Sequence, residues 1–593
     1  MKLLPAALLV VTACVLVFAQ TREFEFINRD DDINVSANPH LNPVSADGLV
    51  ELWTAPYAGL YIPLSYTVWA GVAAVSREGA GSAGALDPGP FHAANVALHA
   101  LASVLVLLLL RHLTDRVAPA LAGALLFALH PLQVESVAWV TELRGLLAAC
   151  LGLGAALAYV AHARPTPFRR TGLAAAALGL FALSLLAKPS VVALPLVLFA
   201  LDTLALRRDW RTALRATAPW FLLAAVVVVA AKSQQDVETI GAGAPLWARP
   251  FIAGDALAFY LGKLFWPAQL AMDYGRTPEA VMQSSGFYAL WSIPAALVAA
   301  VFAVPSLRSA RAPVAIFAAG LLPVLGLVPF GYQRISTVAD RYVYLAMLGP
   351  ALGLCLALAR WNGRALWIGG GLLLAVLGWK SHAQTATWRS SETVFAHAVE
   401  VTPESWSLHV NLGADLSAAG RIDEARAHYL EALRLDPTAA QALYNLGAIA
   451  FRTNQLVEAR NYLERAIAAA PAYSEAHASL GLVATQQGDF VRAEAALREA
   501  LRILPGRAKT HEALGVLFAQ TGKLDEAYRH FGEAVRLEPG YVQGHFNLGY
   551  TAARSGRAQE ARGHYERALE LQADFLPAKR GLKQLDRDGE QDR

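Results

Sequence analysis

The first 380 or so residues contain a succession of apolar runs of about 16 to 20 residues. Runs of roughly 17–25 residues are long enough to cross a bilayer as helices. We therefore predict an all-α fold with about eleven membrane spans, near 3–19, 91–110, 119–137, 145–162, 171–187, 190–206, 217–231, 286–304, 312–330, 341–359 and 365–380. Two further stretches, near 58–75 and 250–266, are interrupted by polar residues or proline, and we predict re-entrant or surface helices there.

Composition separates this region from the rest of the chain. The 593 residues are 55% hydrophobic and 16% charged, with mean hydropathy +0.37, whereas a soluble domain has about 25% charged residues. After about residue 380, apolar and charged residues alternate at helical spacing. The net charge of +3 and the absence of a basic domain give no indication of nucleic-acid binding. Cys14, Cys150 and Cys355 lie in apolar runs and suggest neither a disulfide framework nor a Cys-x-x-Cys metal site.

Arginines in the short loops predict the orientation in the membrane. If the N-terminus is cytoplasmic and the first span is uncleaved, every arginine-rich loop falls on the cytoplasmic side, as the positive-inside rule expects. These loops contain Arg111 and Arg116; Arg164, Arg169 and Arg170; Arg207, Arg208, Arg211 and Arg215; Arg308 and Arg311; Arg360 and Arg364. An odd number of spans then places the C-terminal half outside the cytoplasm.

The C-terminal half has a 34-residue period. Pro403, Pro437, Pro471, Pro505 and Pro539 follow it, as do Gly413, Gly447, Gly481, Gly515 and Gly549. Small residues also recur at Ala425 and Ala432 and their equivalents, with bulky residues between them at Tyr429, Leu463, Leu497, Phe531 and Tyr565. This is the period of tetratricopeptide (TPR) repeats, in which two helices approach closely at the small residues.

These patterns predict a membrane domain over 1–384, a TPR solenoid over 385–573 made of a half repeat and five repeats, and a capping helix and tail over 574–593. The half repeat is indicated by Phe395, Ala398 and Pro403. His409, His477, His511 and His545 recur at a position where TPRs usually bury an aromatic side chain. Because they stand one repeat apart, we interpret them as core residues and not as metal ligands.

Three adjacent carboxylates, Asp30, Asp31 and Asp32, follow the first span. A carboxylate held beside an acceptor can act as a general base on a hydroxyl group. The alternative is a solvated loop or a helix cap.

Further motifs follow in a recognisable order. They are Tyr61-Ile62-Pro63-Leu64, then Phe91-His92-Ala93-Ala94-Asn95 with His99, then His130-Pro131 with Glu135, Ala138 and Trp139, then Asp340-Arg341-Tyr342-Val343-Tyr344, and finally the TPRs. This order resembles the transmembrane-and-TPR-repeat-containing protein O-mannosyltransferases and their bacterial relatives, in the GT-C glycosyltransferase superfamily. The resemblance covers nearly the whole chain. It implies a GT-C-like enzyme that uses a polyprenyl-phosphate-linked sugar, with catalytic acids in the first outer loop.

Position by position, the family's acidic pair lies seven and eight residues before the Asn of its Asn-Pro segment, here Asn38-Pro39. That register selects Asp31 and Asp30 as catalytic and leaves Asp32 outside the motif. The family usually has Arg or His before the Pro of its Pro-Leu segment, where this chain has Ile62.

Ionisable groups near membrane depth are costly and usually mark function. His92, Asn95 and His99 share one helix face. Together with His130, Glu135 and Glu142 they are our pocket candidates. Arg341, Lys188 and Arg144 are our candidates for binding the donor phosphate, because cations suit a phosphate. Singly, each could instead be a helix-end residue whose side chain reaches the interface.

The prediction is an inverting transferase that moves a sugar, a hexose such as mannose, to Ser/Thr hydroxyls of extracytoplasmic proteins. No cofactor beyond the lipid-linked sugar is expected, and the sequence gives no ligand set for a divalent metal. Asn411, Asn445 and Asn547 precede repeat glycines on the concave face, where an amide can bind the backbone of an extended acceptor. The rival is a non-catalytic membrane-anchored TPR scaffold, and a transporter is a weaker third class. A bacterial inner membrane is favoured over the endoplasmic reticulum.

Overall fold

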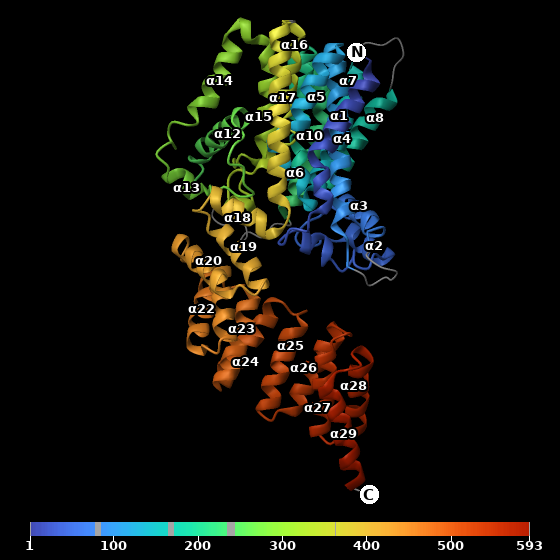
Figure 1. Ribbon diagram of the computed structural model, residues 1–593, viewed down its shortest axis with the longest axis vertical. Helices are drawn as coiled ribbons and strands as arrows, with labels where there is room; N and C mark the ends of the chain where they lie inside the picture. Colours follow the sequence, from blue (N-terminus) through green and yellow to red (C-terminus); the bar gives the residue numbers. More distant parts are fainter. Residues whose placement is uncertain (1, 77–84, 164–170, 234–243, 362, 592–593) are drawn as a thin grey trace. The chain divides into compact units, whose positions relative to one another are not determined.

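The computed structural model describes residues 2–76, 85–163, 171–233, 244–361 and 363–591. Over these residues the chain is helical, and extended pairing is limited to two isolated bridges, Leu41 with Val44 and Tyr57 with Leu60. The chain forms two compact units, Met1–Leu408 and His409–Arg593. Figure 1 shows the long helices of the first unit and the short helix pairs of the second.

An apolar helix or helix pair occupies each of the eleven predicted places. These are α1 (Leu3–Phe18), α4 (Pro88–Thr114), α5 (Val117–Leu129) with α6 (Val134–Ala138), α7 (Leu143–Ala163), α8 (Thr171–Ala187), α9 (Leu194–Ala200), α10 (Trp210–Ser233), α14 (Ser292–Ala303), α15 (Arg311–Leu321), α16 (Leu348–Arg360) and α17 (Arg364–Thr385). Arg164, Arg169 and Arg170 of the predicted cytoplasmic loops lie outside the described residues.

The predicted number of spans is larger than helix length supports. In the part of the chain that the structure describes, five helices are long and apolar enough to cross a membrane, or six if one bent pair counts as a span. Several of the remaining apolar segments are shorter or broken, because apolar composition continues across residues where the helix stops; α17 is 22 residues long and falls short in hydropathy instead. The stretches near 58–75 and 250–266 form α3 (Pro63–Ala73) and α12 (Arg249–Phe265), and neither is among those five.

The outer surface of the first unit fits lipid and not water. Large apolar side chains stand exposed along α1, α10 and α17, among them Leu8, Leu16, Leu222, Val229, Ile368, Leu372 and Trp379. Soluble monomers rarely expose contiguous apolar surface of this kind. The surface therefore agrees with membrane insertion.

The span predicted near 119–137 is bent by 55°. Pro131 has no backbone N–H and disfavours helical geometry at His130, which is extended (φ −75°, ψ 133°). From there the chain runs through η3 (Pro131–Gln133), α6, an extended Trp139 and η4 (Val140–Glu142) before α7 begins. This broken segment, residues 130–142, brings several polar groups to one end of the helices.

The first loop is structured. It contains η1 (Ala19–Glu23), η2 (Asp32–Ser36) and α2 (Ala46–Thr54), and leads into α3. Ser45 caps α2 by accepting a hydrogen bond from the Gly48 backbone N–H, and Pro63 stands in the first turn of α3, where a missing N–H costs nothing. Beyond α12 lie α13 (Pro278–Gln283) and the turns η7 (Pro305–Ala310), η8 (Leu322–Val324), η9 (Gly331–Arg334) and η10 (Asp340–Val343); η5 (Pro189–Ala193) and η6 (Leu201–Ala205) flank α9.

The predicted half repeat packs within the first unit, so the division between units falls after it and not at residue 384. It comprises η11 (Ala386–Trp388) and α18 (Ser391–Val401). Trp388 packs on Trp139 with ring centroids 5.8 Å apart, and His397 Nε2 lies 3.0 Å from the Leu270 carbonyl oxygen. These contacts explain why residues that match a TPR helix belong to the membrane unit.

The second unit is an array of helix pairs. They are α19 (Trp406–Ala418) with α20 (Ile422–Leu435), α21 (Ala440–Arg452) with α22 (Leu456–Ala469), α23 (Ser474–Gln487) with α24 (Phe490–Ile503), α25 (Ala508–Gln520) with α26 (Leu524–Leu537), and α27 (Val542–Arg554) with α28 (Ala558–Leu571). A Cβ atom added to Gly515 would come within 2.5 Å of the Phe531 ring, and the other repeat glycines face Tyr429, Leu463, Leu497 and Tyr565 as closely. The predicted close approach of two helices at the small repeat residues is therefore confirmed.

Of the periodic histidines, His409 and His545 are buried and His477 and His511 are half-buried; three of the four have a second histidine on the following helix. Nδ1 of His409 lies 2.9 Å from Nδ1 of His428, and the same atoms of His511 and His530 are 3.1 Å apart. The rings of His545 and His564 lie 5.9 Å apart. No group of three or more His, Cys, Asp or Glu residues in the described parts of the chain could hold a metal ion. After the last repeat, α29 (Leu576–Gln591) packs its apolar face on α28, as a cap would.

Candidate functional site

Asp31 ties the first loop to the broken segment. Its side chain is fully buried; one carboxylate oxygen accepts the Ile27 backbone N–H at 2.8 Å, and the other accepts the Thr141 backbone N–H at 2.8 Å and the Thr141 hydroxyl. Burial raises the pKa of Asp31 to about 7, against the lowering effect of the bonds from Thr141 and Ile27. Both carboxylate oxygens of Asp31 therefore accept hydrogen bonds that hold the first loop against the broken segment.

The neighbouring Asp30 is oriented differently. Its side chain is 38% exposed, and Oδ2 lies 3.5 Å from a terminal nitrogen of Arg144. Arg29, just before it, has φ +98°, a conformation that non-glycine residues rarely adopt and that tends to occur at functional sites. Of the two predicted acids, Asp30 is therefore the one that an acceptor could reach.

Arg144 is the most loosely paired cation in the cluster. Its Nε lies 3.7 Å from Glu142, is buried, and makes no hydrogen bond. Glu142 is instead bonded to Lys188, whose Nζ donates to both carboxylate oxygens at 2.9 and 2.7 Å. A guanidinium with an unmet buried N–H can accept an anionic ligand without first giving up a close partner.

Arg341 is enclosed. It donates from its side chain to Glu135 Oε1 at 2.5 Å and from its backbone to Oε2 at 2.9 Å. Its guanidinium lies over the rings of Tyr332, Tyr342 and Trp139, at 4.3, 5.1 and 5.5 Å from their centroids. The side chain is only 9% exposed, and Glu142 lies within its electrostatic influence. The Arg341–Glu135 ion pair therefore lies near the Glu142–Lys188 ion pair.

Four pocket candidates bond mainly to backbone. Asn95 donates to the carbonyls of Val137 and Trp139 at 3.2 and 2.7 Å, and His99 contacts the Ala128 carbonyl at 3.0 Å and the Tyr344 hydroxyl at 2.8 Å. His130 lies 3.1 Å from the Leu264 carbonyl, and His92 lies 3.4 Å from that of Glu25. Asn95 and His99 satisfy carbonyls freed where the helix breaks and so hold residues 128–139 in place, while His130 and His92 tie that region to α12 and to the first loop.

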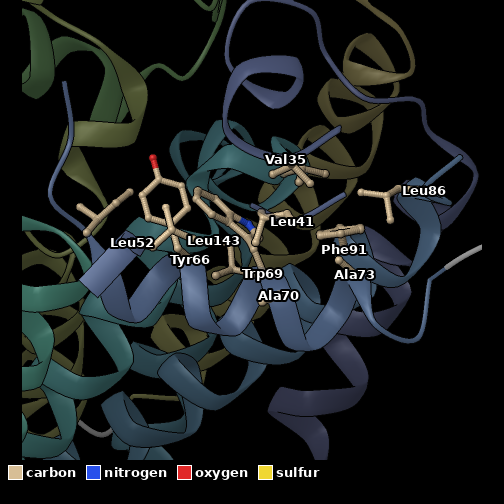
Figure 2. Close-up of a cluster of buried hydrophobic side chains, with 12 residues drawn as sticks. Val35, Leu41, Leu52, Tyr66, Trp69, Ala70, Ala73, Leu86, Phe91 and Leu143 are labelled. Atoms are coloured by element: carbon tan, nitrogen blue, oxygen red, sulfur yellow. The ribbon is translucent and has the colours of Figure 1, made fainter. Parts of the chain in front are cut away.

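Ile62 belongs to an apolar cluster beneath the first loop. The cluster comprises Val35, Leu41, Leu52, Ile62, Tyr66, Trp69, Ala70, Ala73, Leu86, Phe91, Val140 and Leu143. Figure 2 draws these side chains gathered beside α3 and labels most of them. Tyr66 donates its hydroxyl to Asn34 at 3.1 Å. Where the family has a cation, this chain has a packed isoleucine that stabilises the loop.

Several residues that contribute to the site carry no signal in the sequence. Thr141 and Tyr332 stand in no motif, and a single hydroxyl beside a helix end gives no signal on its own. Asp273 is another: it accepts hydrogen bonds from Ser405 and Ser407 at 2.8 and 2.5 Å, and burial raises its pKa. These bonds fix the start of α19, just after the half repeat, to the loop that follows α12.

In the repeat unit, Asn411 and Asn445 are half-buried on α19 and α21. Asn547 is already bonded: its amide donates to Glu512 and accepts from Gln543, both at 3.1 Å. Beside it is a hollow lined by Val516, Ala519, Gln520, Phe531, Phe546, Asn547, Tyr550 and Arg554. Aromatic and hydrogen-bonding groups thus meet on the first helices of the last two repeats.

The tetratricopeptide repeat family matches residues 404–472, 458–508 and 512–574. Among solved structures, the chain is similar to YrrB, described as a TPR protein with an unusual peptide-binding site, at 26% identity over 32% of this chain and 97% of that one, with TM-score 0.28.

Curated relatives extend the similarity into the membrane unit. Drosophila melanogaster protein O-mannosyl-transferase Tmtc1 is 25% identical over 469 residues, covering 61% of this chain and 53% of the relative. Protein O-mannosyl-transferase TMTC1 of Mus musculus is 33% identical over 112 residues, 18% of this chain and 12% of the relative. The chain thus spans about half or less of the curated relatives it matches. With the motif order and the repeats, these matches identify it as a relative of the transmembrane-and-TPR-repeat-containing protein O-mannosyltransferases.

Proposed function

We propose that the chain is a membrane glycosyltransferase that moves a sugar from a polyprenyl phosphate to Ser/Thr hydroxyls of extracytoplasmic proteins. The single observation that supports this best is the pairing of an accessible carboxylate, Asp30, with a cation that keeps an unmet N–H, Arg144. A base beside an anion-binding cation is what transfer between a hydroxyl and a phosphate-linked sugar requires.

In the proposed reaction, Asp30 removes the hydroxyl proton while that oxygen attacks the anomeric carbon. The bond from the anomeric carbon to the phosphate oxygen breaks, and its electron pair stays on the phosphate. Arg144, with Lys188 behind Glu142, stabilises the charge that develops there. A single displacement of this kind inverts the anomeric configuration.

Asp31 and Arg341 fit positioning roles. Each is buried and bonded, Asp31 to the backbone of Ile27 and Thr141 and Arg341 to Glu135. Asp31 orients the loop that presents Asp30, and Arg341 holds the broken segment through Glu135.

The test is to compare glycosylated extracytoplasmic proteins, by mass spectrometry, in cells with the wild-type chain, with Asp30→Asn, and without the chain. We expect Asp30→Asn to match the null cells, with a loss of at least about 100-fold in transfer. Asp32→Asn is the matched control, because the Asp32 side chain accepts a hydrogen bond from the adjacent Ile33 N–H and an amide oxygen can accept it equally, so this variant should retain activity. Normal glycosylation in cells with a folded Asp30→Asn variant would contradict the proposed catalytic role and favour the alternative, a non-catalytic membrane-anchored TPR scaffold.

We further propose that the N-terminus is cytoplasmic and the repeats are extracytoplasmic, which the one-sided arginine loops support. A reporter fused after Arg593 should be active only outside the cytoplasm.

The repeats would hold the acceptor, with Asn411 and Asn445 pairing with its backbone. Replacing both with Ala should raise the apparent KM for a long acceptor and leave a short one unchanged. Equal effects on both would make the repeats a docking surface for whole proteins.

A further inference from the structure

A groove between α5, α16 and α17 lies outside the candidate site. It is lined by Ala118, Leu121, Ala122 and Leu125 from α5, by Leu354 and Leu358 from α16, and by Trp367, Gly370, Gly371 and Leu374 from α17. The α5 and α17 residues each follow the spacing i, i+3, i+4 and i+7, so each set forms one helix face. Figure 1 shows these three helices side by side.

The groove floor is open. A Cβ atom added at Gly370 or at Gly371 would meet no atom within 4 Å. The two glycines therefore leave room for an apolar chain, and the lining contains no hydrogen-bonding side chain other than the Trp367 indole.

One end of the groove is cationic. Arg116 stands just before α5 and donates to the Ala359 carbonyl at 2.7 Å, which holds its guanidinium at the end of α16. Arg360 ends α16 and Arg364 begins α17, within three residues of lining side chains. The chain thus places three arginines where the apolar groove begins.

This end is remote from Asp30 and Arg341. Arg341 precedes the start of α16, whereas Arg360 is its last residue, and a helix of 13 residues is about 20 Å long. A donor whose phosphate lies at Arg144 would not place that phosphate at these arginines.

We propose that the groove binds one anionic phospholipid, with its phosphate at Arg116, Arg360 and Arg364 and an acyl chain over Gly370 and Gly371. Charge complementarity selects an anionic headgroup, and the open apolar floor accepts the chain; basic pockets between spanning helices bind anionic lipids in this way. The leaflet that supplies the lipid depends on the membrane orientation of the chain proposed above. The choice of an anionic lipid does not depend on that orientation.

Native mass spectrometry of the full chain in detergent, with added phosphatidylglycerol or phosphatidylcholine of matched acyl chains, tests the proposal. We expect one phosphatidylglycerol to bind about tenfold more tightly than phosphatidylcholine. Gly370→Leu/Gly371→Leu, which fills the groove, and Arg360→Gln/Arg364→Gln, which removes charge, should each abolish that preference. Gly369→Leu is the matched control, because Gly369 has equal space and does not line the groove.

Equal binding of the two lipids would overturn the proposal, as would a preference that survives both variants. One-for-one displacement of phosphatidylglycerol by polyprenyl phosphate would assign the groove to the donor's tail and also overturn it. All these outcomes are independent of transferase activity.

Discussion

Asp31 and Thr141 lie 110 positions apart and are joined by two hydrogen bonds, from the Thr141 backbone N–H and hydroxyl to the same carboxylate oxygen. The loop that presents Asp30 is therefore fixed by its neighbour to the turn that leads into Arg144. A base and a cation on distant segments are brought together in this way, and the ionised form of Asp31 accepts every bond that does so.

The pH dependence of transfer should reflect Asp31. If Asp31 is protonated, its carboxyl O–H faces a group that also donates, and one of the hydrogen bonds that position the loop is lost. We therefore expect kcat/KM to fall as pH drops through about 7, the pKa of Asp31. Thr141→Val removes a bond that favours the ionised form, and should move this acidic limb to higher pH. Thr141→Ser keeps the hydroxyl and should leave the limb in place. An unchanged limb in Thr141→Val would contradict the positioning role.

Arg144→Lys should lower kcat about 10- to 100-fold at saturating donor, because an ammonium keeps the charge but loses the planar fork that binds phosphate at two points. Arg341→Lys should act differently. It weakens a buried pair with Glu135, so the main expected effect is lower thermal stability in detergent. Steady-state kinetics and thermal unfolding of both variants distinguish phosphate binding by Arg144 from positioning by Arg341. A loss of kcat in Arg341→Lys together with a loss of stability in Arg144→Lys would exchange these two roles.

Repeat packing predicts opposite effects for two glycines of the fourth repeat. Gly515→Ala would push a methyl group into the Phe531 ring, which is 2% exposed and cannot move freely. Overpacking of this kind costs about 1–3 kcal/mol. Gly532→Ala meets nothing within 4 Å and should stabilise α26 by about 0.5–1 kcal/mol. Hydrogen exchange across residues 508–537 of the full chain measures both, and equal protection in the two variants would contradict this packing.

The histidine pairs predict that some repeats loosen in acid. Burial, with the charges of His511, Arg529 and Arg498, lowers the pKa of His530 from 6.5 to about 4, although Glu533 opposes this. Between these values the unfolded chain binds more protons, so stability is full above about pH 6.5 and falls as pH drops toward 4.

Hydrogen exchange should therefore rise at pH 5 in the fourth repeat more than in the third, where Ala496 replaces the second histidine. His530→Gln should remove this difference in hydrogen exchange between the two repeats. If the difference persists in His530→Gln, another group causes the pH response.

Local patterns were enough to predict much of this protein. Apolar runs and the 34-residue period depend only on neighbouring residues, so they predicted the helical membrane unit, the repeats, and the close approach of two helices at the small repeat residues. The choice of Asp30 and Asp31 came instead from the resemblance to the O-mannosyltransferase family, through the position of Asn38-Pro39.

Only the tertiary structure distinguished these two carboxylates, because burial depends on what packs against a residue from elsewhere in the chain. Thr141 covers Asp31, while Asp30 is left exposed beside Arg144. The same reason explains why the span predicted near 119–137 is a bent helix pair in the described structure: hydropathy continues through Pro131, but the helix does not. It also explains the unit boundary, since residues with a TPR pattern pack on Trp139 and Asp273 of the membrane unit.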